Sequence, residues 1–139
     1  MVRLTRAIEF STSLRCTHPD LSQAENERLY GQAARQHGHN YRLEVTLRGA
    51  PDPRTGMVID LKEIQEILER EIMERFDHRD LNRDTSYFEK QAPTHENFAK
   101  VIEGILLAAF PAGWLDRIRL QPDADTWIEI VETPPGGAA

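Results

Sequence analysis

An alternating run of apolar and polar residues near the middle of the chain most restricts how it can fold. Between residues 41 and 49, apolar side chains take every second position, and charged or hydroxyl side chains take the positions between them. Side chains point alternately to opposite faces of a strand, so this period of two predicts a β-strand with one buried face. The turn residues PDPRTG at 51–56 predict a loop after it. The apolar members of the run are Tyr41, Leu43, Val45 and Leu47.

Three helices are predicted from capping residues and apolar stripes. Ser22 and Glu25 form the capping-box pattern of a helix start, and Gly31 supplies a stop. Asp60 caps a second helix and Thr94 a third, and apolar residues at helical spacing follow each cap. These residues are Leu61, Ile64, Ile67, Leu68 and Ile72 in the second helix, and Phe98, Val101, Ile102, Ile105 and Leu106 in the third, which ends before Pro111.

The order of the elements predicts the fold class. Further strands are expected over 2–13, 115–121 and 126–132, the last two as a closing pair. The main elements then follow the order strand, strand, helix, helix, strand, strand (ββααββ), with the short helix inserted after the first strand. This order predicts an α+β fold, in which two helices cover one face of a four-stranded antiparallel sheet. Residues 1–132 are expected to form a single domain, with 133–139 as a disordered C-terminal tail.

Composition places the chain among globular proteins and excludes several functions. Its 139 residues are 40% hydrophobic and 29% charged, which is ordinary for a soluble domain. No apolar run approaches the roughly 20 residues that cross a bilayer, and the N-terminus lacks a secretory signal, so we expect a cytoplasmic location and no membrane partner. The net charge is −6 without a dense basic tract, so no nucleic-acid partner is expected. The exposed edges of such a sheet favour assembly by strand pairing.

The most specific local motif is His37-Gly38-His39-Asn40-Tyr41, at the start of the second strand. Histidines two residues apart on an extended segment point the same way, so their imidazoles can chelate zinc at about 2.0–2.1 Å. The glycine between them lets the backbone approach closely. A bare pair of this kind also occurs as two polar surface histidines. A zinc site with an open position needs a third protein ligand as well.

Three further segments carry candidate chemistry. In Asp77-His78 the carboxylate can orient the imidazole and raise its basicity, although adjacent side chains usually point apart. Thr94 and Glu96 lie at a helix start, which can place N–H groups and a carboxylate at a pocket, or can simply cap the helix. Cys16 is the single cysteine. It is either a small half-buried apolar residue or a metal ligand or nucleophile.

These motifs occur together in an order that resembles the 6-pyruvoyl-tetrahydropterin synthase and 6-carboxytetrahydropterin synthase family, over about residues 3–132. The resemblance implies a T-fold, assembled as a homotrimer or homohexamer with pockets between subunits. It also implies zinc held by three histidines, and elimination of triphosphate from 7,8-dihydroneopterin triphosphate. The carboxytetrahydropterin branch further implies queuosine biosynthesis. The segments that carry the resemblance are Phe10-Ser11-Thr12-Ser13, Leu21-Ser22 to Asn26, HGHNY, GMVIDL at 56–61, Asp77-His78 with Leu81-Asn82, and Pro93-Thr94-His95-Glu96-Asn97.

Positions that match the family's functional residues are expected to keep their roles. In that family a cysteine base works with the Asp–His pair across the subunit boundary, and a glutamate near the C-terminus holds the pterin ring. The matching positions here are His37 and His39 as zinc ligands, Asp77 and His78 as the catalytic pair, and Thr94 and Glu96 beside the ring.

Three positions depart from the family pattern. Leu14 stands where the first zinc histidine is expected, Ala33 where the cysteine is expected, and Gln121 where the ring-binding glutamate is expected. Cys16 is the predicted replacement, as third metal ligand or as catalytic thiol, and His18 is a second candidate ligand. Two interpretations stay open: a divergent zinc-dependent lyase acting on dihydroneopterin triphosphate or a related pterin or purine-like ring, or a catalytically inactive paralogue that binds a pterin-like ligand or has a regulatory role.

Overall fold

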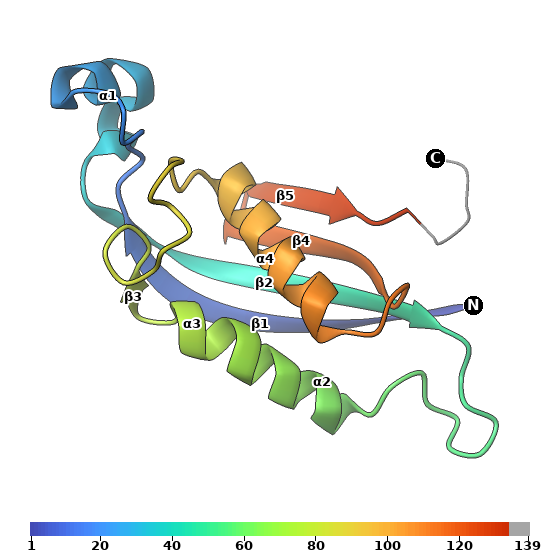
Figure 1. Cartoon of the computed structure of the whole chain (residues 1–139). Coiled ribbons are helices and arrows are strands. Elements are labelled where there is room, and N and C mark those ends of the chain that lie inside the picture. The colour runs from blue at the N-terminus through green and yellow to red at the C-terminus, as the bar shows by residue number, and fades with distance from the viewer. Residues whose placement is uncertain (134–139) are drawn as a thin grey trace.

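The computed structural model describes residues 1–133 as a five-stranded sheet with helices on one face (Figure 1). The sheet order is β3-β1-β2-β4-β5. No helix in this part of the chain is long and apolar enough to span a membrane. Of the predicted tail, residues 134–139 lie outside the described residues. The elements are β1 (Val2–Leu14), α1 (Gln23–Tyr30), the 3-10 turn η1 (Gly31–Ala34), β2 (His37–Gly49), α2 (Leu61–Leu68), the π-helical turn η2 (Glu69–Met73), α3 (Glu74–Phe76), β3 (Arg79–Asp80), α4 (His95–Ala109), β4 (Leu115–Asp123) and β5 (Thr126–Val131).

The α+β class and the order of the main elements are confirmed, but the prediction of a four-stranded antiparallel sheet was wrong. A fifth strand, β3, pairs parallel with β1 at Thr12 and Ser13. His78, with φ 59°, turns the chain so that the segment after α3 runs beside β1. The N–H of His78 then donates to Ser11 O at 2.7 Å. The strand is two residues long, too short to leave an alternating pattern in the sequence.

Each predicted helix begins at its predicted cap. Ser22 accepts from the N–H of Glu25 in a complete capping box, and α1 ends at Gly31, whose φ of 61° suits a glycine. The side chain of Asp60 accepts from Lys62 N at the start of α2. Thr94 caps α4 through Asn97 N. Local hydrogen bonding therefore fixes the helix starts that the sequence indicates.

The helix after Asp60 contains a wider turn that the sequence did not predict. It runs from α2 through the π-helical turn η2 into the short α3. Leu68, Ile72 and Phe76 are each four residues apart and all fully buried. In a regular helix this spacing drifts around the axis, and a wider turn keeps residues four apart on one face. The π turn therefore holds the whole stripe against the sheet.

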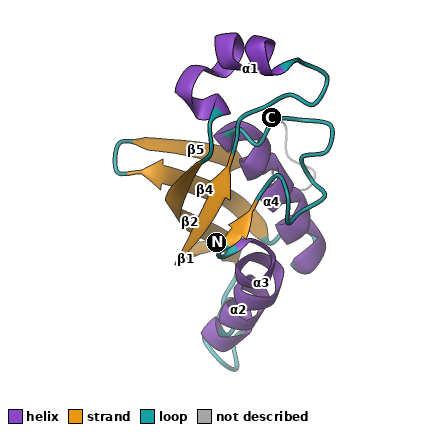
Figure 2. Ribbon diagram, turned by 90° about the vertical axis from the view of Figure 1, so that its left-hand side faces the viewer, coloured by secondary structure: helices purple, strands orange, loops and turns teal. Residues whose placement is uncertain are grey.

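The two faces of the sheet have different environments. The helices α2 to α4 lie against one face, and α1 lies beyond the end of the sheet (Figure 2). On that covered face, Phe98 of α4 packs edge-on against Tyr41 and Phe76 with ring centres 5.2 and 5.0 Å apart. The other face carries charged pairs such as Arg117–Glu129 at 3.3 Å. The alternation in β2 therefore does mark one apolar and one polar face.

Glu132, just after β5, is predicted to make stability depend on pH. Burial, with neighbouring Glu103, raises the pKa of Glu132 to about 7 from an ordinary value of 4.5. In the window between these values the native chain holds a proton that the unfolded chain releases. The contribution to stability is complete below the unfolded pKa, and it is lost as pH rises through the folded pKa. The Glu132→Gln variant should lack this dependence.

Urea unfolding of both proteins from about pH 4.5 to about pH 8 measures the effect. As pH rises over this range, the free energy of unfolding of the unsubstituted protein should fall more than that of Glu132→Gln. The expected difference is on the order of 1 kcal/mol, because partial exposure of Glu132 to solvent screens the interaction. Parallel profiles for the two proteins would contradict a raised pKa at Glu132.

Candidate active site

A pocket of about 520 Å³ opens where β2 begins and α4 begins. Its walls come from four segments of the chain. They are Cys16 after β1, Gln32 and Ala33 in η1, His37 and His39 on β2, and Thr94 to Glu96 at the start of α4. Three of the chain's five histidines therefore meet in this pocket.

The two histidines of the HGH motif lie side by side, as their spacing predicts. Their ring centres are 5.1 Å apart. In the β1–β2 pairing, Gly38 lies opposite Ser13, and a Cβ at Gly38 would stand 3.0 Å from Thr12 O. Only glycine fits there without a backbone shift, so Gly38 allows the close strand pairing that positions both imidazoles.

His95, the first residue of α4, brings a third imidazole to the pair. Its ring centre is 4.8 Å from that of His39. Its Nδ1 is 3.0 Å from the hydroxyl of Tyr41, which lies two residues after His39 on the same face of β2. From the sequence, Thr94 and Glu96 were predicted as a helix cap and as residues beside the bound ring, and no role was predicted for His95.

The surroundings of His39 and His95 favour the neutral form of these two imidazoles. Burial lowers the pKa of His39, and the nearby His95 and His37 lower it further. Burial is also the main cause that lowers the pKa of His95, against an opposing effect of Glu96. Neutral imidazole is the form that binds metal ions.

Cys16 lies in the wall of this pocket, beside the position where a cysteine is missing. Its N–H donates to Ala33 O at 2.8 Å, so the two residues are neighbours. The side chain is buried, with Sγ 3.9 Å from Pro93 O. Burial raises the pKa of the Cys16 thiol, and the charge of Glu96 raises it further. The site thus holds a neutral thiol next to the histidines.

The Asp77–His78 pair is formed, but it does not line this pocket. Nδ1 of His78 is 3.0 Å from Asp77 Oδ1, which also accepts from Ser11 N at 3.0 Å. That N–H of Ser11 is the main cause that lowers the pKa of Asp77. The unusual φ of His78 is what turns two adjacent side chains toward each other. The His78 side chain is 82% exposed, at the side of β1 away from β2.

The three remaining positions singled out from the sequence do not line this pocket. Leu14 is fully buried in the core and sits opposite His37 in the strand pairing, so it offers no ligand. Gln121 pairs with Arg42, on the sheet face opposite Tyr41 and the pocket. His18 accepts from the N–H of Asp20 at 3.1 Å within its own loop.

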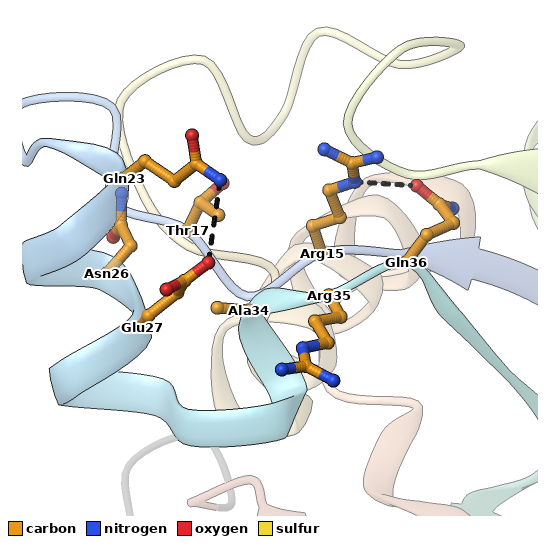
Figure 3. A pocket seen from close by; sticks show the side chains of 8 residues that line it. All are labelled: Arg15, Thr17, Gln23, Asn26, Glu27, Ala34, Arg35 and Gln36. Carbon is orange, nitrogen blue, oxygen red and sulfur yellow. Dashed lines mark hydrogen bonds between the residues drawn. The ribbon is translucent and has the colours of Figure 1, made fainter.

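A second cavity, of about 500 Å³, lies between α1, the segment that follows β1 and the segment that precedes β2 (Figure 3). It is polar, and Arg15 donates to Gln36 Oε1 there at 3.1 Å. The side chains of Arg15 and Arg35 point to different sides of the loop (Figure 3), so they do not converge on one anion. The chemistry that can hold a metal ion is in the histidine pocket.

The chain is similar to known proteins over most of its length. Residues 3–133 match the family model described as 6-pyruvoyl tetrahydropterin synthase. The chain is 41% identical over 136 residues to 6-pyruvoyl tetrahydrobiopterin synthase of Drosophila melanogaster, covering 94% of this chain and 74% of the relative. It is 38% identical over 120 residues to the Homo sapiens protein of that name, covering 85% and 83%.

A solved structure shows the same fold. The 6-pyruvoyl tetrahydropterin synthase of Caenorhabditis elegans superposes with a TM-score of 0.88 at 29% identity, over 95% of this chain and 96% of that one. The matches extend over nearly all of the described residues and include the strands, helix starts and loops that build the pocket. The chain belongs to the 6-pyruvoyl tetrahydropterin synthase family.

Proposed function

We propose that this protein is a zinc-dependent lyase that eliminates triphosphate from 7,8-dihydroneopterin triphosphate. The observation that carries the proposal is the His37–His39 pair, in a pocket of a chain about 40% identical to 6-pyruvoyl tetrahydrobiopterin synthases. The donor set fits zinc, since imidazole nitrogens are among its usual ligands. When bound, zinc supplies a Lewis acid that polarises the oxygens of the substrate side chain.

Residues of this chain would then bind the ring and move protons. Thr94 and Glu96 border the pocket at the start of α4, where exposed N–H groups and a carboxylate can hold a pterin ring. Cys16 supplies a thiol beside Ala33, and we assign it the proton-transfer role. The Cys16 thiol lines the same pocket as the three histidines, which are a usual kind of partner for such a proton.

The Asp77–His78 pair fits a site completed between subunits. His78 is largely exposed, and Asp77 holds it in a fixed orientation. Apart from the two-residue contact with β3, β1 presents an open edge on this side. In a homotrimer or homohexamer formed by pairing such edges, His78 of one subunit can reach the pocket of the next.

Two observations favour the second candidate function, a paralogue that binds a pterin-like ligand without turning it over. Burial holds Cys16 as a neutral thiol, which is a poor base, and Ala33 has no proton acceptor. Gln121 stands where the ring-binding glutamate is expected; it has an amide in place of the carboxylate and lies on the sheet face opposite the pocket. Such a paralogue would keep the pocket but not the elimination.

Triphosphate release and ligand binding, measured side by side, separate the two functions. The zinc-supplemented protein is incubated with 7,8-dihydroneopterin triphosphate, with His39→Ala as the inactive variant and His18→Ala as the matched histidine control. A lyase releases triphosphate in proportion to enzyme, loses this with His39→Ala, and keeps it with His18→Ala. Saturable calorimetric binding without release would establish the paralogue and refute the lyase.

A further inference from the structure

We propose that His95 is the third metal ligand of this chain, completing a His37–His39–His95 zinc site in place of a ligand from β1. The use of such a zinc ion rests on the proposed function, but the ligand set is inferred from the residues of the pocket. The position on β1 that faces His37 is Leu14, a buried leucine without a donor atom. A ligand must therefore enter from another element, and α4 supplies an imidazole.

The spacing of two of the three ring pairs fits one shared ion. Two imidazoles bound through one nitrogen each to a tetrahedral ion, at about 2.0–2.1 Å, have ring centres about 5 Å apart. The His37 and His39 centres are 5.1 Å apart, and the His39 and His95 centres are 4.8 Å apart. His39 is thus the central member, with one neighbour from its own strand and one from the helix.

His37 and His95 each use Nδ1 in a hydrogen bond, which leaves the Nε2 atom of each ring free. Nδ1 of His37 is 2.7 Å from Arg35 O, and a carbonyl can only accept, so Nδ1 carries the proton and Nε2 keeps its lone pair. Nδ1 of His95 is bonded to the hydroxyl of Tyr41, which leaves its Nε2 available. Metal-binding histidines regularly have such a partner on the second nitrogen, because it fixes the tautomer and the ring orientation.

Metal binding requires the rings to turn. Within residues 1–133, no three His, Cys, Asp or Glu side chains already have their donor atoms gathered as a metal site. The three rings are only partly buried, and they border an open pocket, so side-chain rotation can bring their free nitrogens together. The backbone that carries them is fixed by the β1–β2 pairing and by the Thr94 cap.

Two other side chains compete for the role of third ligand. Cys16 borders the same pocket and is the only thiol in the chain. Its Sγ lies against Pro93 O, and it shares no ring or hydrogen-bond contact with His37 or His39. His18 is held by Asp20 in the loop before α1, outside the pocket. Of the three candidates, only His95 contacts the HGH pair.

The test is the zinc content and zinc affinity of the full chain, purified without a tag or chelator. Zinc per chain is measured by elemental mass spectrometry, and affinity by competition with a chromogenic chelator. The variants are His95→Ala and Tyr41→Phe, with Cys16→Ala, His18→Ala and Tyr87→Phe as controls. Tyr87 is a suitable match for Tyr41, because its hydroxyl also holds a partner, Arg75, but away from the pocket.

The unsubstituted chain is expected to hold about one zinc ion. The His95→Ala substitution should weaken zinc binding more than about 100-fold, since it removes a ligand rather than a supporting group. Tyr41→Phe should weaken it by about 10–100-fold, as loss of a supporting hydrogen bond does. The three control variants should bind as the unsubstituted chain does. Unchanged affinity in His95→Ala, loss of zinc in Cys16→Ala, or a chain that binds no zinc would overturn the proposal.

Cobalt substitution tests ligation by Cys16 even if His95→Ala does not fold. Co²⁺ in an all-histidine site shows no thiolate-to-metal charge-transfer band in the near ultraviolet, whereas ligation by Cys16 produces one. Zinc binding that depends on His95, without triphosphate release, would refute the lyase and leave this ligand set standing. Release with unchanged zinc affinity in His95→Ala would refute the ligand and leave the lyase standing.

Discussion

Replacing Asp116 with alanine is expected to destabilise the native chain by about 3–5 kcal/mol, because it leaves a buried guanidinium without its partner. Arg48 and Asp116 are both buried, and Arg48 Nη1 donates to Asp116 Oδ1 at 3.2 Å. Arg48 also donates to Gly113 O through Nε, at 3.0 Å. The other carboxylate oxygen accepts from Arg3 Nε at 3.0 Å. The pair therefore ties together the start of β1, the end of β2 and the start of β4.

A β-bulge explains how a carboxylate comes to be buried in a strand. In the β2–β4 pairing, Leu47 faces Leu115 and Thr46 faces Arg117, so Asp116 is the extra residue between them. A bulge turns such a residue out of the regular alternation and re-aims its side chain. Here both Leu115 and Asp116 are buried although they are adjacent.

Urea unfolding measures the loss, and a surface pair between β4 and β5 provides the control. Arg117 and Glu129 are 3.3 Å apart, with side chains 46% and 38% exposed. Glu129→Ala breaks that pair, and it should change the free energy of unfolding by no more than about 1 kcal/mol. Losses of similar size in Asp116→Ala and Glu129→Ala would contradict a structural role for the buried pair.

Replacing Phe98 with alanine is expected to remove about 3–5 kcal/mol of stability and to loosen the histidine pocket. Phe98 is fully buried, and its ring contacts four aromatic neighbours. Its centre lies 5.0 Å from that of Phe76 and 5.2 Å from that of Tyr41. Tyr41 in turn holds His95, so the cavity left by the lost ring borders the support of the proposed metal ligand.

Two further substitutions on α4 serve as controls: one replaces Phe98 with leucine, and the other truncates Leu107. Phe98→Leu keeps much of the buried volume and should lose clearly less stability than Phe98→Ala. Leu107→Ala truncates a side chain that is 48% exposed on the same helix, and it should change stability by within about 0.5 kcal/mol. Equal effects of Phe98→Ala and Leu107→Ala on the unfolding midpoint would show that the aromatic cluster does not stabilise the chain.

Patterns local in sequence predicted the fold well. The Ser22 box and the Asp60 and Thr94 caps act within one turn, so their donors and acceptors can be read from neighbouring letters. The alternation in β2 reports burial on one face of a single strand. β3 was missed because it depends on the backbone of His78 and on the partner strand β1. The π turn was missed because a helical stripe does not reveal how the backbone bonds within it.

The candidate site was only partly predictable for the same reason. His37 and His39 share a strand, and their period of two predicted their juxtaposition. His95 reaches them only because the start of α4 lies beside the start of β2, which is a tertiary contact that no local pattern encodes. The Asp77–His78 contact ran against the expectation for adjacent residues, since it needs an uncommon φ at His78. The catalytic roles of Asp77, His78 and Cys16 remain predictions.

Anomalous diffraction at the zinc edge, from crystals of the zinc-bound protein, tests the His37–His39–His95 site directly. One strong peak is expected in the pocket of each subunit, within about 2.0–2.1 Å of a nitrogen of His37, His39 and His95. A pocket without a peak in protein that turns over its substrate, or a peak bonded to Cys16 with His95 turned away, would contradict it.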